Sequence, residues 1–205
     1  MPRLLSSVAL ALSLASGAAA QHNHAAPEAS GDDPHAVLST FVVDGFRIDE
    51  ADPPPGSGVG RAGLRYADGG YVHVVYGKPY ARGRVIWGGV VGFGQVWAAG
   101  AHHATELVTT VPLVLGGTRV EPGAYSLFVT PHHNGWTVHV NRALGMHLAD
   151  EYDAALDVAR VDLTPEALQT PTEGLTWAFR RDGAFLTLSW GDLAGSVPLA
   201  RATSG

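Results

Sequence analysis

Short β-branched and aromatic runs separated by glycine-containing turns constrain the fold of this chain more than any other feature. Gly116-Gly117 and Asp182-Gly183 each lie between two such runs, and these dipeptides favour tight hairpin turns because they accept positive φ. Between them, Tyr125, Leu127 and Val129 alternate along one face, as in a strand with one buried side. Many short strands with closely spaced turns indicate an antiparallel sandwich or barrel. We predict a mainly β, antiparallel β-sandwich-like single domain.

Helical signals are confined to two short segments. Thr164-Pro165-Glu166 combines an N-cap residue, a proline at the first helical position and an acid in the first turn. Residues 142–153 can hold a second short helical segment. We therefore expect one or two short helical turns beside the strands.

The chain divides into a short N-terminal part and a β body. Residues 37–48 are apolar-rich and predict a first strand, whereas residues 52–63 are rich in Pro and Gly and predict a loop. We assign residues 37–70 to this N-terminal strand and Pro/Gly-rich loop, and residues 71–200 to the β-sandwich domain.

The first twenty residues have the pattern of a secretory signal peptide. Arg3 supplies positive charge, residues 4–14 are mainly apolar, and Ala18-Ala19-Ala20 supplies the small residues that a signal peptidase reads. A membrane anchor is the alternative, but this apolar run is shorter than the ~20 residues that a span needs. We expect cleavage between Ala20 and Gln21, a disordered leader over residues 21–36, no later transmembrane segment, and a periplasmic or secreted protein.

Composition excludes several kinds of chemistry. The chain has no cysteine, which excludes thiolate nucleophiles, Cys-type zinc sites and redox disulfides. Its 46% hydrophobic content must therefore stabilise the fold through burial alone. A net charge of −6 makes nonspecific nucleic-acid binding a poor expectation, because such binding depends on neutralising phosphates with Lys and Arg.

A candidate binding site lies between residues 76 and 105, where basic and aromatic residues gather on this acidic chain. Arginine grips carboxylate, sulfate or phosphate, and aromatic faces stack on sugar rings. The alternative is that the cations pair with surface acids and the tryptophans anchor the core. The candidate ligand-binding residues are Tyr76, Lys78, Arg82, Arg84, Trp87, Trp97 and His102.

Histidines provide a separate, metal-binding hypothesis. His102 and His103 are the candidate ligands of a zinc or copper ion, together with another histidine, because imidazole suits both metals and three ligands make a site. His132-His133 lies in a predicted turn. The alternative is that they are ordinary surface and loop histidines. His139 alternates with valines and belongs to the more polar face of its strand. The sequence itself requires no cofactor.

No catalytic signature is present. The acidic residues between 150 and 157 are typical of a solvated face, and Ser126 lies in a predicted strand instead of a nucleophile elbow. Phosphate-loop and dinucleotide fingerprints are missing as well. We therefore leave catalytic residues unassigned and favour a protein that is not an enzyme.

Several motifs follow one another along the chain, namely Tyr76-Gly-Lys-Pro, Gly83-Arg-Val-Ile-Trp-Gly-Gly, Pro122-Gly-Ala-Tyr-Ser-Leu-Phe, Tyr152-Asp153, Asp157-Val-Ala-Arg-Val and Leu186-Thr-Leu-Ser-Trp. Together they resemble the motifs of the bacterial family DUF2911, and the resemblance implies an exported, single-domain β protein without an established activity. Around the second tryptophan the family pattern is approximately Trp-Arg-Thr-Gly-Ala-Asn-Glu-Ala-Thr. This chain departs from it at Ala98, Ala99, His102 and His103, which puts any function carried over from relatives in doubt at this place.

Three functions remain as hypotheses. The first is a non-catalytic small-molecule binding module for an anion or a sugar-like ligand. The second is a metal-dependent hydrolase or metal-binding protein that uses the histidines, and the third is a structural or envelope assembly protein. The expected partner is accordingly a small molecule or an envelope component of unknown identity.

Overall fold

The computed structural model describes residues 37–44 and 56–203, with side chains described from residue 56 onward. The signal peptide predicted for residues 1–20 and the leader predicted for residues 21–36 lie outside these residues. Within the described ranges no helix has the length and apolar character needed to cross a bilayer.

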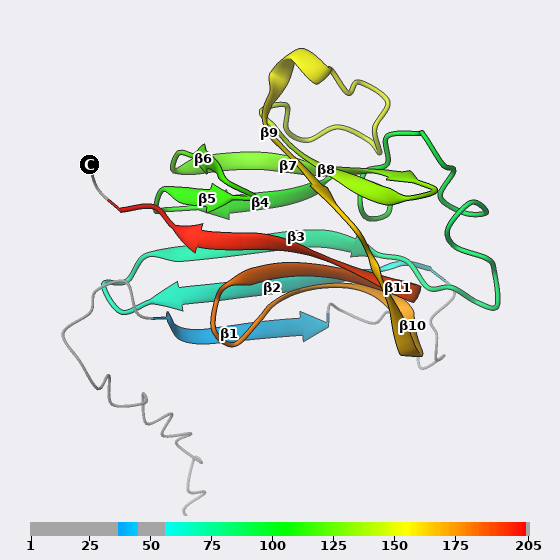
Figure 1. Cartoon of the computed structure of the whole chain (residues 1–205), viewed down its shortest axis with the longest axis horizontal. Helices are drawn as coiled ribbons and strands as arrows, with labels where there is room; N and C mark the ends of the chain where they lie inside the picture. The colour runs from blue at the N-terminus through cyan, green and yellow to red at the C-terminus, as the bar shows by residue number, and fades with distance from the viewer. Residues whose placement is uncertain (1–36, 45–55, 204–205) are drawn as a thin grey trace, which may run out of the picture.

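The regular elements of the described residues are all β-strands except for a single 3₁₀ turn (Figure 1). The elements are β1 Val37–Asp44, β2 Gly58–Tyr66, β3 Tyr71–Lys78, β4 Thr105–Thr109, β5 Leu113–Leu115, β6 Thr118–Val120, β7 Gly123–His132, β8 Gly135–Asn141, η1 Ala154–Leu156, β9 Asp157–Leu163, β10 Glu166–Phe179 and β11 Phe185–Arg201.

These strands build two antiparallel sheets. One has seven strands in the order β1-β2-β3-β4-β7-β8-β9, and the other has four in the order β10-β11-β5-β6. In Figure 1 the long β10–β11 hairpin lies across the strands β1 to β3, and β10 packs against these three strands. This arrangement confirms the predicted β-sandwich-like domain.

The core lies between the two sheets because each strand turns one apolar face inward. Tyr125, Leu127 and Val129 of β7 share the inner face, as predicted, and the tryptophans of β10 and β11 face them across the core. Trp177 is 0% exposed and Trp190 is 1% exposed. Burying a large apolar side chain of this kind contributes about 1.5–3 kcal/mol, so this layer can hold the fold together without disulfides.

The glycine-based hairpins form where the sequence predicts them. Gly116 and Gly117 connect β5 to β6 with φ of 54° and 91°, and Gly183 connects β10 to β11 with φ of 68°. Positive φ suits glycine because it has no Cβ. The β5–β6 turn has two residues, whereas the β10–β11 connection comprises residues 180–184.

Residues 58–63 were predicted as a loop, and this prediction is wrong, because they form the first part of β2, a strand inside the seven-stranded sheet. Gly60 faces the ring of Tyr76, and a Cβ on Gly60 would meet that ring at 2.2 Å. The glycine here permits close approach of a neighbouring side chain, so its presence does not mark a turn. The sandwich therefore begins before residue 71.

Neither helical segment forms at the residues predicted for it, although one short helical turn is present. Glu166 begins β10, where it pairs with Ala194, so Thr164-Pro165-Glu166 leads into a strand. Residues 142–153 connect β8 to η1 without regular structure, and the 3₁₀ turn Ala154–Leu156 follows them. Its N-cap is Asp153, whose carboxylate accepts a hydrogen bond from the Ala155 N–H at 2.8 Å.

Candidate functional site

A long loop, residues 79–104, joins β3 to β4, and its second half is bonded to the seven-stranded sheet. Trp97 and Val129 exchange two backbone hydrogen bonds, each with an N–O distance of 2.9 Å, so the loop extends the β4–β7 ladder. Further along, the Ala101 N–H donates to the Gly77 carbonyl at 3.2 Å. A Cβ on Gly77 would lie 1.9 Å from the Ala101 carbonyl oxygen. Glycine at position 77 is therefore required for the loop to cross the strand here.

Ala99 is the most firmly held residue of this loop. It is fully buried and has a left-handed backbone with φ of 52°, which costs a non-glycine residue about 1–2 kcal/mol. Its carbonyl accepts hydrogen bonds from the Trp177 indole N–H at 3.0 Å and from the Thr105 hydroxyl at 2.9 Å. These two bonds offset the strain and fix the loop against the other sheet.

An open cleft of about 370 Å³ lies beside this loop. Its walls come from the loop, from the residues just before β2, from the β8–β9 connection and from β11. We call it the arginine–tryptophan cleft. No aspartate or glutamate is among its lining residues in the described part of the chain. The side chains that define it are Tyr80, Arg82, Arg84, Val90, Trp97, His102, Leu148 and Trp190.

Two backbone carbonyls hold the Arg84 guanidinium in place. Its Nε donates to the Ala81 carbonyl at 3.0 Å, and one Nη donates to the Tyr80 carbonyl at 2.7 Å. No carboxylate of residues 56–203 forms an ion pair with it. Arg84 is exposed and lines the cleft, so an anion can bind there without first displacing a carboxylate partner.

Arg82 lies next to Arg84 and is oriented by a strained backbone. Its φ is 50°, its backbone N–H donates to the Glu173 carboxylate at 2.7 Å, and its guanidinium donates to the Gly56 carbonyl at 2.8 Å. The guanidinium also lies 5.9 Å from the centre of the Tyr80 ring. Backbone carbonyls therefore help to position both arginines beside the cleft.

Left-handed residues gather around this cleft. In the described ranges the non-glycine residues with positive φ are Arg82, Ala99, His102 and Leu148. Three of them line the cleft, and Ala99 precedes Gly100, which lines it as well. The Leu148 N–H donates to the His102 carbonyl at 3.1 Å, so two of the strained residues support each other. Backbone strain of about 1–3 kcal/mol per residue persists where surrounding structure enforces it, and it concentrates at binding and catalytic sites.

The cleft meets the core through a chain of tryptophans. Ring centres are 4.3 Å apart for Trp136 and Trp87, 5.9 Å for Trp87 and Trp97, and 5.8 Å for Trp97 and Trp190. Trp97 is only half-buried, and its indole N–H donates to the Gly100 carbonyl at 3.1 Å. Its ring therefore supplies an apolar wall to the cleft and has its polar group already satisfied.

The structure brings together four of the seven binding residues predicted from sequence, namely Arg82, Arg84, Trp97 and His102. Tyr76 and Lys78 lie on the inner face of β3 instead, with exposures of 2% and 9%. Trp87 is 9% exposed and donates its indole N–H to the Trp190 carbonyl, so it is a core residue. Trp190, Tyr80 and Leu148 line the cleft but were not among the predicted residues.

The histidine pairs do not assemble into a cluster. His103 pairs with His147 through an isolated β-bridge, and His133 contacts the ring of Phe93 at 4.3 Å. Over residues 56–203 no three His, Asp or Glu side chains lie close enough together to hold a metal ion. The zinc or copper site predicted at His102 and His103 stays a prediction without added support.

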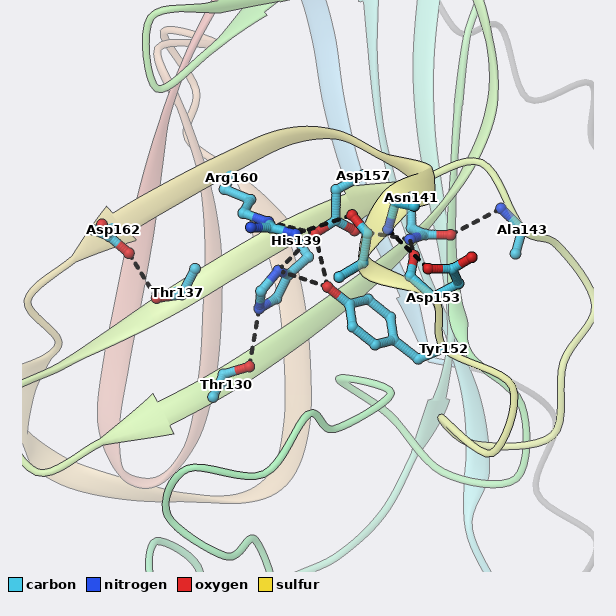
Figure 2. A network of polar contacts seen from close by, with 12 residues as sticks. Thr130, Thr137, His139, Asn141, Ala143, Tyr152, Asp153, Asp157, Arg160 and Asp162 are labelled. Atoms are coloured by element: carbon cyan, nitrogen blue, oxygen red, sulfur yellow. Dashed lines mark hydrogen bonds and ion pairs between the residues drawn. The ribbon is translucent and has the colours of Figure 1, made fainter.

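A buried polar network occupies the opposite, outer face of β8, and sequence analysis missed it (Figure 2). His139, which was predicted to lie on the polar face, is 7% exposed. Its Nε2 lies 2.9 Å from the Thr130 hydroxyl, and its Nδ1 lies 3.1 Å from both Asp157 Oδ2 and the Tyr152 hydroxyl. A neutral imidazole with its proton on Nδ1 satisfies all three contacts.

Asp157 is the centre of this network, and its side chain is 4% exposed. It accepts hydrogen bonds from Asn141 Nδ2 at 2.7 Å, the Tyr152 hydroxyl at 2.7 Å and Arg160 Nε at 2.6 Å. Burial alone would raise the pKa of Asp157, but the hydrogen bonds outweigh it and lower the pKa below its usual value. Burial, followed by the hydrogen bond to Asp157, raises the pKa of Tyr152 to about 12.

This network positions a loop, and we assign it no catalytic role. Hydroxyl, imidazole and carboxylate follow one another as in a hydrolytic triad. However, Thr130 is only 7% exposed, and neither it nor His139 lines the cleft. The network instead bonds residues 142–156 to the sheet, since Asn141 donates to the Asp153 carbonyl and Arg160 donates to the Ala154 carbonyl. That loop carries Leu148 into the cleft.

A protein-family model matches most of the chain. The model of the family described as "Protein of unknown function (DUF2911)" matches residues 63–199. The chain belongs to the DUF2911 family. In this DUF2911 domain the match runs from β2 to β11 and includes the whole loop 79–104. No curated protein and no solved structure shows significant similarity to the chain.

The positions at which the sequence is expected to depart from the DUF2911 pattern lie in the same loop. Ala98 is 1% exposed and packs with Phe128 and Met146 in a small cluster on the outer face of the sheet. An arginine here would have to displace those side chains. His102 lies at the cleft wall, and His103 lies outside the cleft beside His147. The departures therefore alter the cleft wall and the packing behind it.

Proposed function

We propose that this DUF2911 domain is a non-catalytic binding module whose arginine–tryptophan cleft takes a small anionic ligand with a flat apolar or sugar-like ring. The observation that carries the proposal is the position of Arg84. Its guanidinium is fixed by two backbone carbonyls, faces the cleft and has no carboxylate partner in residues 56–203. A preorganised donor loses little side-chain entropy on binding, so more of the interaction energy appears as affinity.

Two further features support the same site. Trp97 offers a half-buried ring next to the arginines, which suits stacking against a sugar ring or an aromatic acid. Three residues that line the cleft, Arg82, His102 and Leu148, have strained left-handed backbones, and such strain is common at binding sites. A volume of about 370 Å³ accommodates a ligand of roughly monosaccharide size.

Isothermal titration calorimetry with charged and uncharged counterparts tests the proposal. Galacturonate, benzoate and sulfate are titrated into the protein, with galactose and benzyl alcohol as neutral partners of the first two. We expect at least one anion to bind while its neutral partner does not. Changing Arg84 to Gln should weaken that anion by roughly tenfold or more, because a charge-assisted hydrogen bond contributes about 1.5–3 kcal/mol.

Arg142→Gln is the matched control. Arg142 is exposed, and it lies outside the cleft. Equal losses in the Arg84 and Arg142 variants would show that only net charge matters and would overturn the proposal. Failure of all three anions to bind would overturn it as well.

We also propose that the protein acts outside the cytoplasm, in the periplasm or beyond it. Support comes from the signal-peptide pattern of residues 1–20. N-terminal sequencing of the protein from its native host should begin at Gln21. A protein that still carries Met1 and remains in the cytoplasm would contradict this.

A further inference from the structure

A second cavity, of about 610 Å³, adjoins the cleft on the outer face of the seven-stranded sheet. The two cavities share Ser57, Ala101 and His102, so the segment of loop that crosses Gly77 separates them. We call the second one the Glu106 cavity. Its floor is formed by the outward side of β3 and β4, and its polar and charged lining includes Ser57, His102, His103 and Glu106.

Glu106 has no charged residue opposite it on either neighbouring strand. It pairs with Val75 of β3 on one side and Ser126 of β7 on the other, and neither carries charge. The Ser126 hydroxyl is already committed to the Ala143 carbonyl at 2.6 Å. Glu106 is half-buried and forms no hydrogen bond or ion pair with any residue in the described part of the chain. Partial burial of a carboxylate without a paired cation costs free energy, and a bound cation would offset that cost.

The remaining walls favour one class of ligand. No lysine or arginine lines the Glu106 cavity, while Val59, Val75 and Ala104 give it apolar surface. Val59 is 43% exposed, so some of this apolar surface is open to solvent. A primary ammonium group matches the carboxylate, and a short hydrocarbon body matches these walls.

We propose that the Glu106 cavity binds a small organic cation through its ammonium group. The site is separate from the arginine–tryptophan cleft and opposite to it in charge. The proposal does not depend on the cleft binding an anion, since Arg82 and Arg84 do not line the Glu106 cavity.

The test is a nitrogen–proton correlation NMR titration of the full-length mature protein at about neutral pH. Butylammonium, butanol and butyrate are the probes, because they share a hydrocarbon body and differ in charge. Butylammonium should shift the backbone amide signals of Gly77, Ala101 and Ala104 saturably, whereas butanol and butyrate should not. This comparison needs no mutation, so it holds even if a variant fails to fold.

Glu106→Gln keeps the side-chain shape and should weaken butylammonium binding at least about fivefold. Glu151→Gln is the matched control, because Glu151 is exposed and lies outside the cavity. Arg84→Gln should leave butylammonium binding unchanged, which separates this site from the cleft. Equal shifts with butanol, or unchanged binding in the Glu106 variant, would overturn the proposal. Displacement of butylammonium by stoichiometric zinc would also overturn it, in favour of a metal site.

Discussion

Changing Asp157 to Asn perturbs the polar network without altering its shape. The carboxylate accepts from Asn141 at one oxygen and from Tyr152, Arg160 and His139 at the other. Asparagine has a single acceptor oxygen, so its NH₂ group must face donors on one side. The less costly orientation keeps the oxygen toward Tyr152 and places the NH₂ group against Asn141, whose amide is fully buried.

The expected loss of stability follows from these contacts. Leaving a buried donor without its acceptor costs about 1–3 kcal/mol. Loss of the charge weakens the bonds from Tyr152 and His139 by roughly 1 kcal/mol each, because charge-assisted hydrogen bonds are about twice as strong as neutral ones. The bond from exposed Arg160 is discounted for solvent screening. We therefore expect Asp157→Asn to lower the free energy of unfolding by about 3–5 kcal/mol.

Urea unfolding followed by circular dichroism measures this change. Asp162→Asn is the control, because Asp162 is exposed and holds only the Thr137 hydroxyl, so its loss should stay below about 0.5 kcal/mol. Because the pKa of Asp157 is lowered in the folded protein, its contribution is complete above the unfolded carboxyl pKa of about 3.9. It is lost as the pH falls through the folded pKa, so wild type and variant should converge in acid. A loss under about 1 kcal/mol at neutral pH would refute the assignment of Asp157 as the centre of the network.

Three other predictions follow from the described contacts. Tyr152→Phe should make stability less sensitive to alkali, because the neutral phenol is favoured in the fold and its contribution is lost as pH rises from 10.0 toward about 12; alkaline unfolding curves check this. Gly77→Ala should lower the free energy of unfolding by about 1–3 kcal/mol, because its Cβ would lie 1.9 Å from the Ala101 carbonyl oxygen. Gly56→Ala is the control in urea unfolding and should be nearly neutral, because a Cβ there has no neighbouring atom within 4 Å. Leu148→Gly should relieve left-handed backbone strain and leave the free energy of unfolding unchanged. Leu144 has no positive φ, so Leu144→Gly should lower the free energy of unfolding by about 0.5–1 kcal/mol. Thermal unfolding of both variants measures the difference.

Local signals predicted much of the fold. Gly116-Gly117 was interpreted correctly because a two-residue turn depends only on the φ values that its own residues can adopt. Asp182-Gly183 marks a hairpin as predicted, but the connection is longer and comprises residues 180–184. Gly60 was misinterpreted because the reason for that glycine is the ring of Tyr76 on the neighbouring strand, which composition does not reveal. The N-cap pattern at Thr164 failed because pairing between β10 and β11 outweighs a local helical preference.

The cleft was partly predictable for a similar reason. Arg82, Arg84, Trp97 and His102 lie within one loop, so their proximity in sequence carried over into space. Leu148 and Trp190 reach the cleft from distant segments, and no spacing rule connects them to that loop. The role of Asp157 depended on its β-pairing with Asn141 across a register shift, which only the structure reveals.

The row of neighbouring tryptophan rings also gives the protein an intrinsic spectroscopic signal for binding at the cleft. Four tryptophan rings follow one another in space in the order Trp136, Trp87, Trp97 and Trp190. The centres of neighbouring rings are no more than 5.9 Å apart, so their electronic transitions couple. Only one of the four, Trp97, is more than slightly exposed, and it borders the cleft. Trp190 also lines the cleft, so a molecule that enters there perturbs one end of the coupled set, and the near-ultraviolet circular dichroism of the whole set should change. Occupancy can thus be followed without any label.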